Sequence, residues 1–327
     1  MKIAITGHLG TLGAPLTAKL RERGHDVTGI DLRHSHDGER ADVADLRQLV
    51  GAMPDGVDLV YHLAAEFGRH NGEDFTEQLW RSNVIGTKNL LRLQEVEGFR
   101  MIFASSSEVY GEKARDILHE RDIAQSGELT NDYAISKWVN EQQIENARKQ
   151  WDTETMVLRF FNAYGPGEYY HAYRSVVCLF CYRALMGLPY DVYTGYHRVF
   201  QYVDDLVDTL ANAARRFHPG ETINVGGVEY RSVEEMHRIV SDVVGVDPDR
   251  RDVNRLSLDA HNIVNKRPDI TKAQRMLGHH PTVKLEEGIA ETVDWLRGVY
   301  ANGIAAAEAQ GRDPGGTGAP GVVLARS

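Results

Sequence analysis

Three glycines at a spacing of three residues, Gly7, Gly10 and Gly13, constrain the fold of this chain more than any other feature of its sequence. The run from Lys2 to Thr6 before them has the apolar character of a strand, and the stretch from Thr11 to Arg23 has the pattern of a helix. Gly7 permits a tight turn between the two, and Gly13 lets the helix pack closely against the strand. The sequence therefore predicts a strand, a tight turn and a helix whose N-terminal N–H groups face the turn.

The first half of the chain continues this alternation of apolar runs and amphipathic stretches. Parallel sheets covered by helices on both faces have this pattern, so we expect an α/β fold with a Rossmann-type doubly wound parallel sheet. The pattern loosens after about residue 162, where a smaller C-terminal α/β cap is expected. The expected strands are 2–6, 26–30, 58–63, 101–105, 156–161 and 222–225, and the expected helices are 11–23, 74–94 and 133–150.

These expectations divide the chain into three parts. Residues 1–162 are predicted to form most of the sheet domain, with a return to it at about 198–230. Residues 163–300 are predicted to form most of the cap. The last segment, 301–327, contains a run rich in glycine and proline that gives little core, and a flexible tail is expected there.

The composition argues against several classes of function. The 327 residues carry a formal net charge of -10, so an extended nucleic-acid surface is not expected. No leader pattern follows Met1, and the most apolar later stretch, Ser175 to Leu188, contains Arg183 and is too short to span a membrane. Cys178 and Cys181 are too few for a structural zinc site, so we predict buried thiols, no metal site and a reducing, cytoplasmic location.

The glycine-rich turn has the features of a dinucleotide site. Gly10 would let the backbone approach a pyrophosphate, and Asp31 ends the second expected strand about 20 residues further on, where an acid binds the adenosine ribose. A carboxylate there repels a 2′-phosphate, which favours NAD over NADP. Asn83 either anchors backbone or water near this site or is a polar residue of helix packing, and the two interpretations have equal weight. The other expected cofactor contacts are Leu12, Asp42, Val43, Leu63, Ala64 and Ala65.

A serine, a tyrosine and a lysine supply the parts of an acid/base site. Tyr133 and Lys137 are four residues apart, so a helix places them on one face. The lysine ammonium is expected to lower the phenol pKa, so that the tyrosinate takes a hydroxyl proton while hydride leaves the same carbon for NAD. Ser106, at the end of an expected strand, would hydrogen-bond that oxygen. With a nucleotide fingerprint upstream, this set predicts oxidation of an alcohol, and Tyr133 and Lys137 are also expected to contact the cofactor.

From Met1 to about Tyr300 the chain resembles the extended short-chain dehydrogenase/reductase family, particularly its nucleotide-sugar epimerases, dehydratases and decarboxylases. The motifs that carry the resemblance include Asn162-Ala163-Tyr164-Gly165-Pro166 and the run Arg198 to Asp205. The resemblance implies that the cap binds a nucleotide-diphosphate sugar and that the protein forms a homodimer through the helices near 74–94 and 133–150. Substrate contacts are expected at Asn162, Arg198 and Arg267, together with Ser107, Arg174 and Asn224 in or beside these motifs.

Glu108 beside the serine is a carboxylate that alcohol oxidation does not need. It favours a lyase over a plain 4-epimerase, and the pair Ser107-Glu108 resembles UDP-glucuronate decarboxylases, in which Glu108 would lie near C5 of the sugar. Glu66, in Ala-Ala-Glu, resembles the dTDP-glucose 4,6-dehydratases, and the aromatic stretch 168–174 is an unusual feature that would shape the sugar pocket. Dehydration, epimerisation and a non-enzymatic NAD-binding regulator therefore stay open beside decarboxylation.

Overall fold

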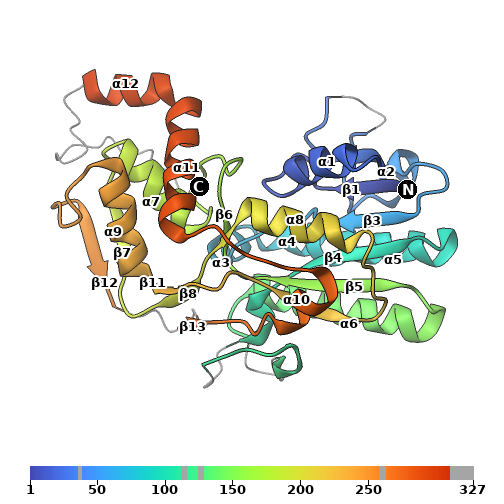
Figure 1. Ribbon diagram of the computed structural model, residues 1–327. Helices are drawn as coiled ribbons and strands as arrows, with labels where there is room; N and C mark the ends of the chain where they lie inside the picture. Colours follow the sequence, from blue (N-terminus) through green and yellow to red (C-terminus); the bar gives the residue numbers. More distant parts are fainter. Residues whose placement is uncertain (36–38, 112–115, 124–128, 258–262, 310–327) are drawn as a thin grey trace.

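A six-stranded parallel sheet forms the centre of the molecule in the computed structural model, which describes residues 1–35, 39–111, 116–123, 129–257 and 263–309 (Figure 1). The strand order is β10-β5-β4-β3-β1-β2, so the chain starts near the middle, runs to one edge and then crosses to the other. This is the doubly wound sheet that the sequence predicts. The strands are β1 (Lys2–Thr6), β2 (Asp26–Ile30), β3 (Leu59–His62), β4 (Arg100–Ser106), β5 (Thr155–Phe160) and β10 (Thr222–Val225).

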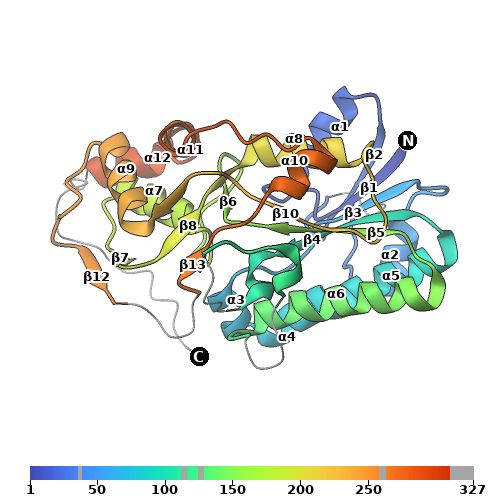
Figure 2. The same cartoon turned by 60° about the horizontal axis from the view of Figure 1, so that its bottom comes forward.

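Helices cover both faces of this sheet (Figure 2). The reason is visible in β1, where Ile3 and Ile5 belong to one apolar core and Ala4, between them, belongs to the other. One face packs against α1 (Gly13–Glu22), α8 (Val203–Ala213) and α10 (Thr271–Leu277), and the other against α2 (Leu46–Ala52), α5 (Gly86–Glu97) and α6 (Asp132–Trp151).

A smaller α/β part lies at one end of the sheet, built mainly from the second half of the chain (Figure 1). Its helices α7 (Val176–Leu185), α9 (Val233–Val244) and α11 (Leu285–Val299) pack against one another. Between α7 and α9 the chain returns to the central sheet through α8 and β10, within the range expected for that return. Its strands are β6 (Ala163–Tyr164), β7 (Tyr190–Tyr193), β8 (His197–Val199), β9 (Gln201–Tyr202), β11 (Tyr230–Ser232), β12 (Val253–Leu256) and β13 (Asn265–Lys266).

Two predicted elements differ in the structure. The single helix expected over 74–94 is divided into α3 (Arg69–Asp74), α4 (Thr76–Trp80), a π-helical turn η1 (Arg81–Ile85) and α5. The wide turn brings Asn83 into the interior, where it is 1% exposed. The expected flexible tail is helical at its start, because α12 (Ala301–Ala309) continues from α11 and contacts it, while 310–327 lie outside the described residues.

Cys178 and Cys181 are buried and unpaired on α7, which confirms the prediction for the thiols. Among the residues that the structure describes, no helix is both long enough and apolar enough to cross a membrane.

Candidate active site

The expected cofactor and catalytic residues come together where the central strands end. The carboxyl ends of parallel strands lie along the same edge of the sheet. The residues that follow β1, β2, β3 and β4 are therefore neighbours along this edge although they are far apart in sequence. The cap reaches the same edge, because the Thr11 hydroxyl donates to the Gly167 carbonyl oxygen at 3.4 Å.

Packing requires glycine at two positions of the turn between β1 and α1. A Cβ on Gly7 would lie 2.7 Å from the backbone nitrogen of Ala64, and Gly7 also has a positive φ of 74°. A Cβ on Gly13 would lie 2.4 Å from the Gly7 carbonyl oxygen. Gly10 is less crowded, since its Cβ would meet that same oxygen at 3.1 Å and nothing else within 4 Å. Leu12 stands directly before the first turn of α1. This is the cradle that a pyrophosphate requires at a helix N-terminus.

Asp31 lies at the end of β2 beside this turn and is 7% exposed. Its carboxylate accepts hydrogen bonds from the backbone N–H of Leu9 at 3.1 Å and of Arg33 at 2.9 Å. Burial by itself would raise the pKa of Asp31, but these bonds and the Arg33 guanidinium hold it below its ordinary value. An ionised acceptor therefore stands where an adenosine ribose is expected, so the turn and Asp31 together fit the two parts of NAD.

The remaining cofactor candidates line the same edge. Asp42 is half-buried and ion-paired with Arg81 at 3.0 Å, while Val43 is buried against Gly86. Leu63, Ala64 and Ala65 follow β3, and all three are partly exposed.

Asn83 makes both kinds of contact that its two interpretations describe, with a backbone segment near the site and with a neighbouring helix. Its side chain accepts from the Glu66 N–H and donates to the Glu66 carbonyl oxygen, both at 2.9 Å. It also donates to the Ser136 hydroxyl at 3.0 Å, and that hydroxyl donates to the Tyr133 carbonyl oxygen. Asn83 thus holds the segment after β3 against the helix that carries Tyr133 and Lys137.

Tyr133 contacts Ser106, and Lys137 follows Tyr133 by one turn on α6. Ser106 ends β4, and the Tyr133 hydroxyl is hydrogen-bonded to it. The expected lowering of the phenol pKa is wrong for this structure: burial raises the pKa of Tyr133 to about 12, and the Glu108 charge adds to that rise. Lys137 is 4% exposed and donates to the Ala104 carbonyl oxygen at 2.8 Å; burial lowers its pKa to about 8, against the opposing effect of Glu141.

Glu108 has a partner that the sequence did not reveal. Lys266 of β13, 158 residues away, forms a hydrogen-bonded ion pair with its carboxylate. Burial would raise the pKa of Glu108, but Lys266, Arg198 and a hydrogen bond with Asn131 keep it below the ordinary value. Burial lowers the pKa of Lys266, and the charges of Arg198 and Arg69 lower it further. Glu108 is therefore an ionised carboxylate paired with Lys266, and the Arg198 charge acts on both.

Four of the expected substrate residues lie at the end of β4 or at the strands that join the cap to the sheet. Ser107 is buried beside Ser106, and Asn162, with a φ of 43°, donates to the Val199 carbonyl oxygen at 2.9 Å. Arg198 is paired in register with Lys266, and Arg267 lies over the Tyr230 ring at 5.4 Å.

Asn224 is enclosed by protein groups, and the aromatic stretch 168–174 has partners in both parts of the molecule. Asn224 is 0% exposed, and its amide donates to the Leu118 carbonyl oxygen and accepts from the Tyr110 hydroxyl, so the predicted substrate contact is wrong. Of the aromatic stretch, Tyr170 stacks on Tyr182 of the cap helix α7 with ring centroids 3.7 Å apart, whereas the Tyr173 hydroxyl donates to the Asp74 carboxylate at 2.6 Å. Arg174 lies over the Phe67 ring at 4.9 Å, half-buried.

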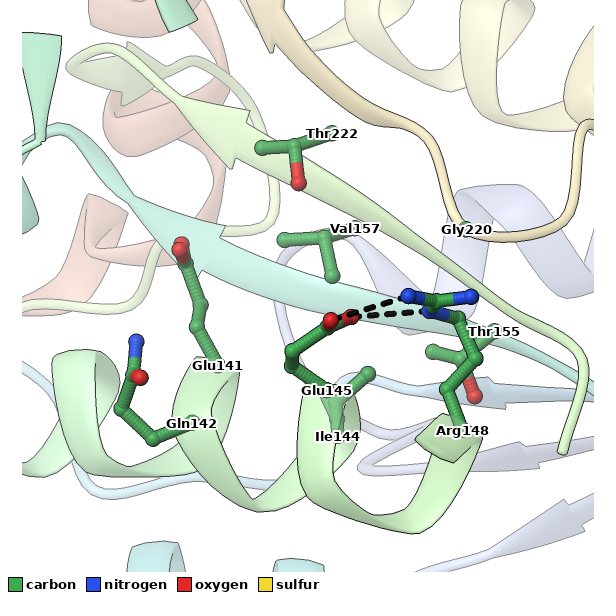
Figure 3. A pocket seen from close by; sticks show the side chains of 9 residues that line it. All are labelled: Glu141, Gln142, Ile144, Glu145, Arg148, Thr155, Val157, Gly220 and Thr222. Atoms are coloured by element: carbon green, nitrogen blue, oxygen red, sulfur yellow. Dashed lines mark hydrogen bonds and ion pairs between the residues drawn. The ribbon is translucent and has the colours of Figure 1, made fainter. Parts of the chain in front are cut away.

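A separate hollow lies between α6 and the β5–β10 edge of the sheet, where Glu145 and Arg148 form an ion pair at 2.8 Å (Figure 3). None of its lining residues is one of the predicted site residues, and the side of α6 that borders it faces the strands. The lining residues are Glu141, Gln142, Ile144, Glu145, Arg148, Thr155, Val157, Gly220 and Thr222.

Comparison with known proteins gives the context of this site. A model of the NAD dependent epimerase/dehydratase family matches residues 3–226. UDP-glucuronic acid decarboxylase 1 of Xenopus tropicalis is 31% identical over 312 residues, covering 90% of this chain and 72% of that protein. UDP-glucose 4-epimerase of Mycolicibacterium smegmatis is 29% identical over 317 residues, covering 91% of this chain and 99% of that protein. The structure of MoeE5 in complex with UDP-glucuronic acid and NAD has a TM-score of 0.79 and 26% identity, covering 91% of this chain and 100% of that one.

Proposed function

The chain belongs to the NAD dependent epimerase/dehydratase family, and on that premise we propose that it decarboxylates a nucleotide-linked uronic acid of the UDP-glucuronate type. The observation that carries the proposal is the charge around Glu108. Lys266 is paired with it, and Arg198 and Arg69 are close enough to lower the Lys266 pKa. Together these four groups carry an excess of positive charge, and Glu108 among them is close enough to Tyr133 to raise its pKa. A uronate carboxylate is the sugar substituent that this positive charge would favour.

The residues around Tyr133 fit the first step, oxidation at C4 of the sugar. Ser106 would hold the C4 oxygen, and Tyr133 would accept the hydroxyl proton as the tyrosinate, with Lys137 on the same helix face. Because burial raises the pKa of Tyr133, this step needs the positive charge of the nicotinamide of NAD, when bound, to favour the tyrosinate. NAD, when bound in the glycine-rich turn, supplies the acceptor for the C4 hydride.

The residues around Glu108 fit the second step. A ketone at C4 makes the uronate a β-keto acid, so the bond between C5 and the carboxyl carbon can break with release of carbon dioxide. The electron pair left on C5 then needs a proton. With the Glu108 carboxylate ionised, the proton of this pair resides on Lys266. We therefore assign the Glu108–Lys266 pair to a position beside C5 of the sugar, where it would supply this proton. The product is a 4-keto-pentose nucleotide, or a pentose nucleotide if the hydride returns to C4.

One relative and one neighbour support this choice of substrate. The Xenopus tropicalis relative is a UDP-glucuronic acid decarboxylase, whereas MoeE5 was solved with UDP-glucuronic acid and also with UDP-glucose. The dehydratase alternative loses part of its basis, because the Glu66 carboxylate is occupied by the side chains of Asn71 at 3.0 Å and Gln78 at 2.8 Å. Epimerisation at C4 is favoured by the Mycolicibacterium smegmatis relative and uses the same Ser106, Tyr133 and Lys137.

The deciding experiment incubates the protein with NAD and, separately, UDP-glucuronate, UDP-glucose, dTDP-glucose and GDP-mannose, and analyses the products by mass spectrometry. We expect loss of carbon dioxide from UDP-glucuronate. A 6-deoxy-4-keto product from a neutral sugar would establish a dehydratase, and a product of unchanged mass with inverted C4 would establish an epimerase.

A matched pair of lysine variants tests the charge argument. Lys266→Met should lower turnover of UDP-glucuronate by roughly 100-fold or more, as expected for loss of a group that acts on the reacting atoms. Lys272→Met, which removes an ion pair with Glu221 at the edge of the sheet, should leave turnover unchanged. Equal turnover in the two variants would contradict the assignment of Lys266.

We further propose a homodimer through α5 and α6 and a cytoplasmic location. Ile85, the last residue of η1 directly before α5, is 49% exposed, and Val96 near the end of α5 is 80% exposed, which is unfavourable for apolar side chains in water. Sedimentation velocity tests the dimer, with Ile85→Asp as the disrupting variant. The unpaired, buried cysteines fit a reducing compartment.

A further inference from the structure

A buried ion pair adjoins the catalytic residues without a role in the proposed reaction. Glu141 of α6 is 7% exposed and Arg159 of β5 is 3% exposed. The Arg159 guanidinium donates to the Glu141 carboxylate from Nε at 2.9 Å and from Nη2 at 2.7 Å. Figure 3 shows the Glu141 side chain pointing from α6 toward the strands. Apolar residues of similar volume often stabilise a fold as well as a buried ion pair does, so stability alone does not explain this pair.

The Glu141 carboxylate joins α6 to the end of β4. The Ser105 hydroxyl donates to Glu141 Oε1 at 2.6 Å, and Ser105 is 3% exposed. Ser105 directly precedes Ser106, the last residue of β4, whereas α6 carries Tyr133 and Lys137. The bond between Ser105 and Glu141 therefore connects the two elements whose relative position brings Ser106 to Tyr133.

Glu141 is also the carboxylate that acts on Lys137. The two residues are four apart on α6, so their side chains lie on one face of the helix. Burial lowers the pKa of Lys137, and the Glu141 charge opposes this effect. On β3, burial and the Lys137 charge lower the pKa of His62 to about 3, which keeps that ring uncharged. Within the described residues, Glu141 is thus the negative charge that favours the Lys137 ammonium.

The other charged groups on α6 and on the elements packed against it are exposed or have partners of their own. The exposed ones outside α6 are Glu77, Arg92 and Glu97. The paired ones are Arg69 with His70, Glu73 with the Asp132 N–H, Asp74 with Tyr173, Arg81 with Asp42, Glu95 with Lys88, Arg100 with Glu154, Glu108 with Lys266 and Glu145 with Arg148 and Lys149. Glu112, Lys113, Arg115 and Glu128 lie outside the described residues.

Arg159 is itself held in a fixed position. Its Nη1 donates to the Tyr110 hydroxyl at 3.0 Å and to the Glu120 carbonyl oxygen at 2.8 Å. The guanidinium also lies over the Tyr110 ring at 4.9 Å. A planar guanidinium that donates through two nitrogens fixes the direction of a paired carboxylate. Arg159 therefore holds the Glu141 carboxylate in the position where it accepts from Ser105.

We propose that Glu141 is a positioning residue for C4 oxidation, which holds the end of β4 through Ser105 and favours the ammonium form of Lys137. A charged Lys137 favours the tyrosinate of Tyr133, the form that accepts the hydroxyl proton. The inference rests on the oxidation step of the proposed function and is independent of whether decarboxylation follows.

Ser105→Ala tests the link to β4, because it removes the hydroxyl and leaves the ion pair intact. Steady-state kinetics use NAD and the sugar nucleotide that the wild type turns over. The kcat should fall roughly 10-fold to 100-fold, as expected when catalytic groups are misplaced by up to about 1 Å, while KM changes little. A purely structural role would leave the kcat of the folded protein unchanged.

Glu141→Gln/Arg159→Met tests the charge. Replacing both partners avoids a buried arginine without its anion, and the glutamine carbonyl oxygen can still accept from Ser105. Lysines labelled with carbon-13 at Cε are titrated by NMR, and Lys137→Met identifies the Lys137 signal. Lys137 should release its proton at lower pH in the double variant than in the wild type, because the opposing carboxylate charge is gone.

Arg250→Met/Asp252→Asn is the matched control, because it removes a buried ion pair of 3.0 Å in the cap. It should leave kcat and the Lys137 titration unchanged. The inference is wrong if Ser105→Ala retains the wild-type kcat, if Lys137 titrates at the same pH in the Glu141 double variant, or if the control lowers kcat as much as Ser105→Ala. A wild type that oxidises no sugar nucleotide would contradict the proposed function, and the lysine titration would then still decide the charge assignment.

Discussion

Lys137 should make the stability of this protein depend on pH in a way that one substitution removes. Its side chain is 4% exposed, donates to the Ala104 carbonyl oxygen at 2.8 Å and lies 5.0 Å from the centre of the Phe103 ring. Burial lowers its pKa to about 8 in the folded protein, against about 10.4 for an exposed lysine in the unfolded chain.

The sign of the effect follows from the two pKa values. At pH values between the two pKa values, Lys137 is protonated in the unfolded chain but has released its proton in the folded protein. The free energy of unfolding therefore rises with pH in this range. From about pH 7 to about pH 9.5 the rise covers roughly 1.5 pKa units, which is about 2 kcal/mol at 1.36 kcal/mol per unit. This window also ends below the range in which tyrosines titrate.

The assay is urea unfolding of wild type and Lys137→Met at both pH values, with the same NAD content in all samples. We expect the difference in unfolding free energy, wild type minus variant, to be about 2 kcal/mol larger at the higher pH. Lys149→Met on the same helix is the control, because Lys149 is 66% exposed and its ion pair with Glu145 contributes little to stability. A difference that does not change with pH would refute the reasoning, since it would mean that the folded lysine titrates like the unfolded one.

Three further changes have defined outcomes. Tyr133→Phe should lose roughly 100-fold to 10,000-fold in turnover while NAD binding by calorimetry persists, and full activity would contradict its assignment as the acid/base. Glu141→Gln leaves the buried Arg159 without its anionic partner at 2.7 Å, so urea unfolding should show a loss of about 3–5 kcal/mol; a loss below about 1 kcal/mol would be inconsistent with the buried pair. Gly13→Ala places a Cβ 2.4 Å from the Gly7 carbonyl oxygen and should weaken NAD binding at least about 10-fold, as the loss of about 1.4 kcal/mol implies; unchanged binding would show that the turn tolerates the side chain.

The sheet domain was predictable because its signals are local. Strand and helix periods differ, which makes the strands recognisable: β1, β2 and β10 begin and end at the predicted residues, and β3, β4 and β5 differ from them by one residue at each end. The proximity of Asp31 to the glycine-rich turn was also predictable, because adjacent parallel strands end at the same edge of the sheet. The same reasoning brought Ser106 to Tyr133 and Lys137, since one ends a strand and the other two share a helix face.

The interior turn at Asn83 was not predictable in the same way. A π-helical turn has no strong sequence pattern, and helix propensity alone favours one continuous helix over 74–94. Contacts with Glu66 and Ser136 decide the local backbone there, and both residues come from other segments.

The sequence by itself determined the sheet domain, the dinucleotide turn and the Ser106–Tyr133–Lys137 set, because each depends on spacing within an element or on the common end of neighbouring strands. Only the tertiary structure decided that Lys266 pairs with Glu108 and that Asn224 is fully enclosed. It also decided that the Tyr133 pKa rises in this structure. The physical reason is that ion pairing, burial and desolvation depend on how the cap folds back onto the sheet, across sequence separations that no local pattern encodes.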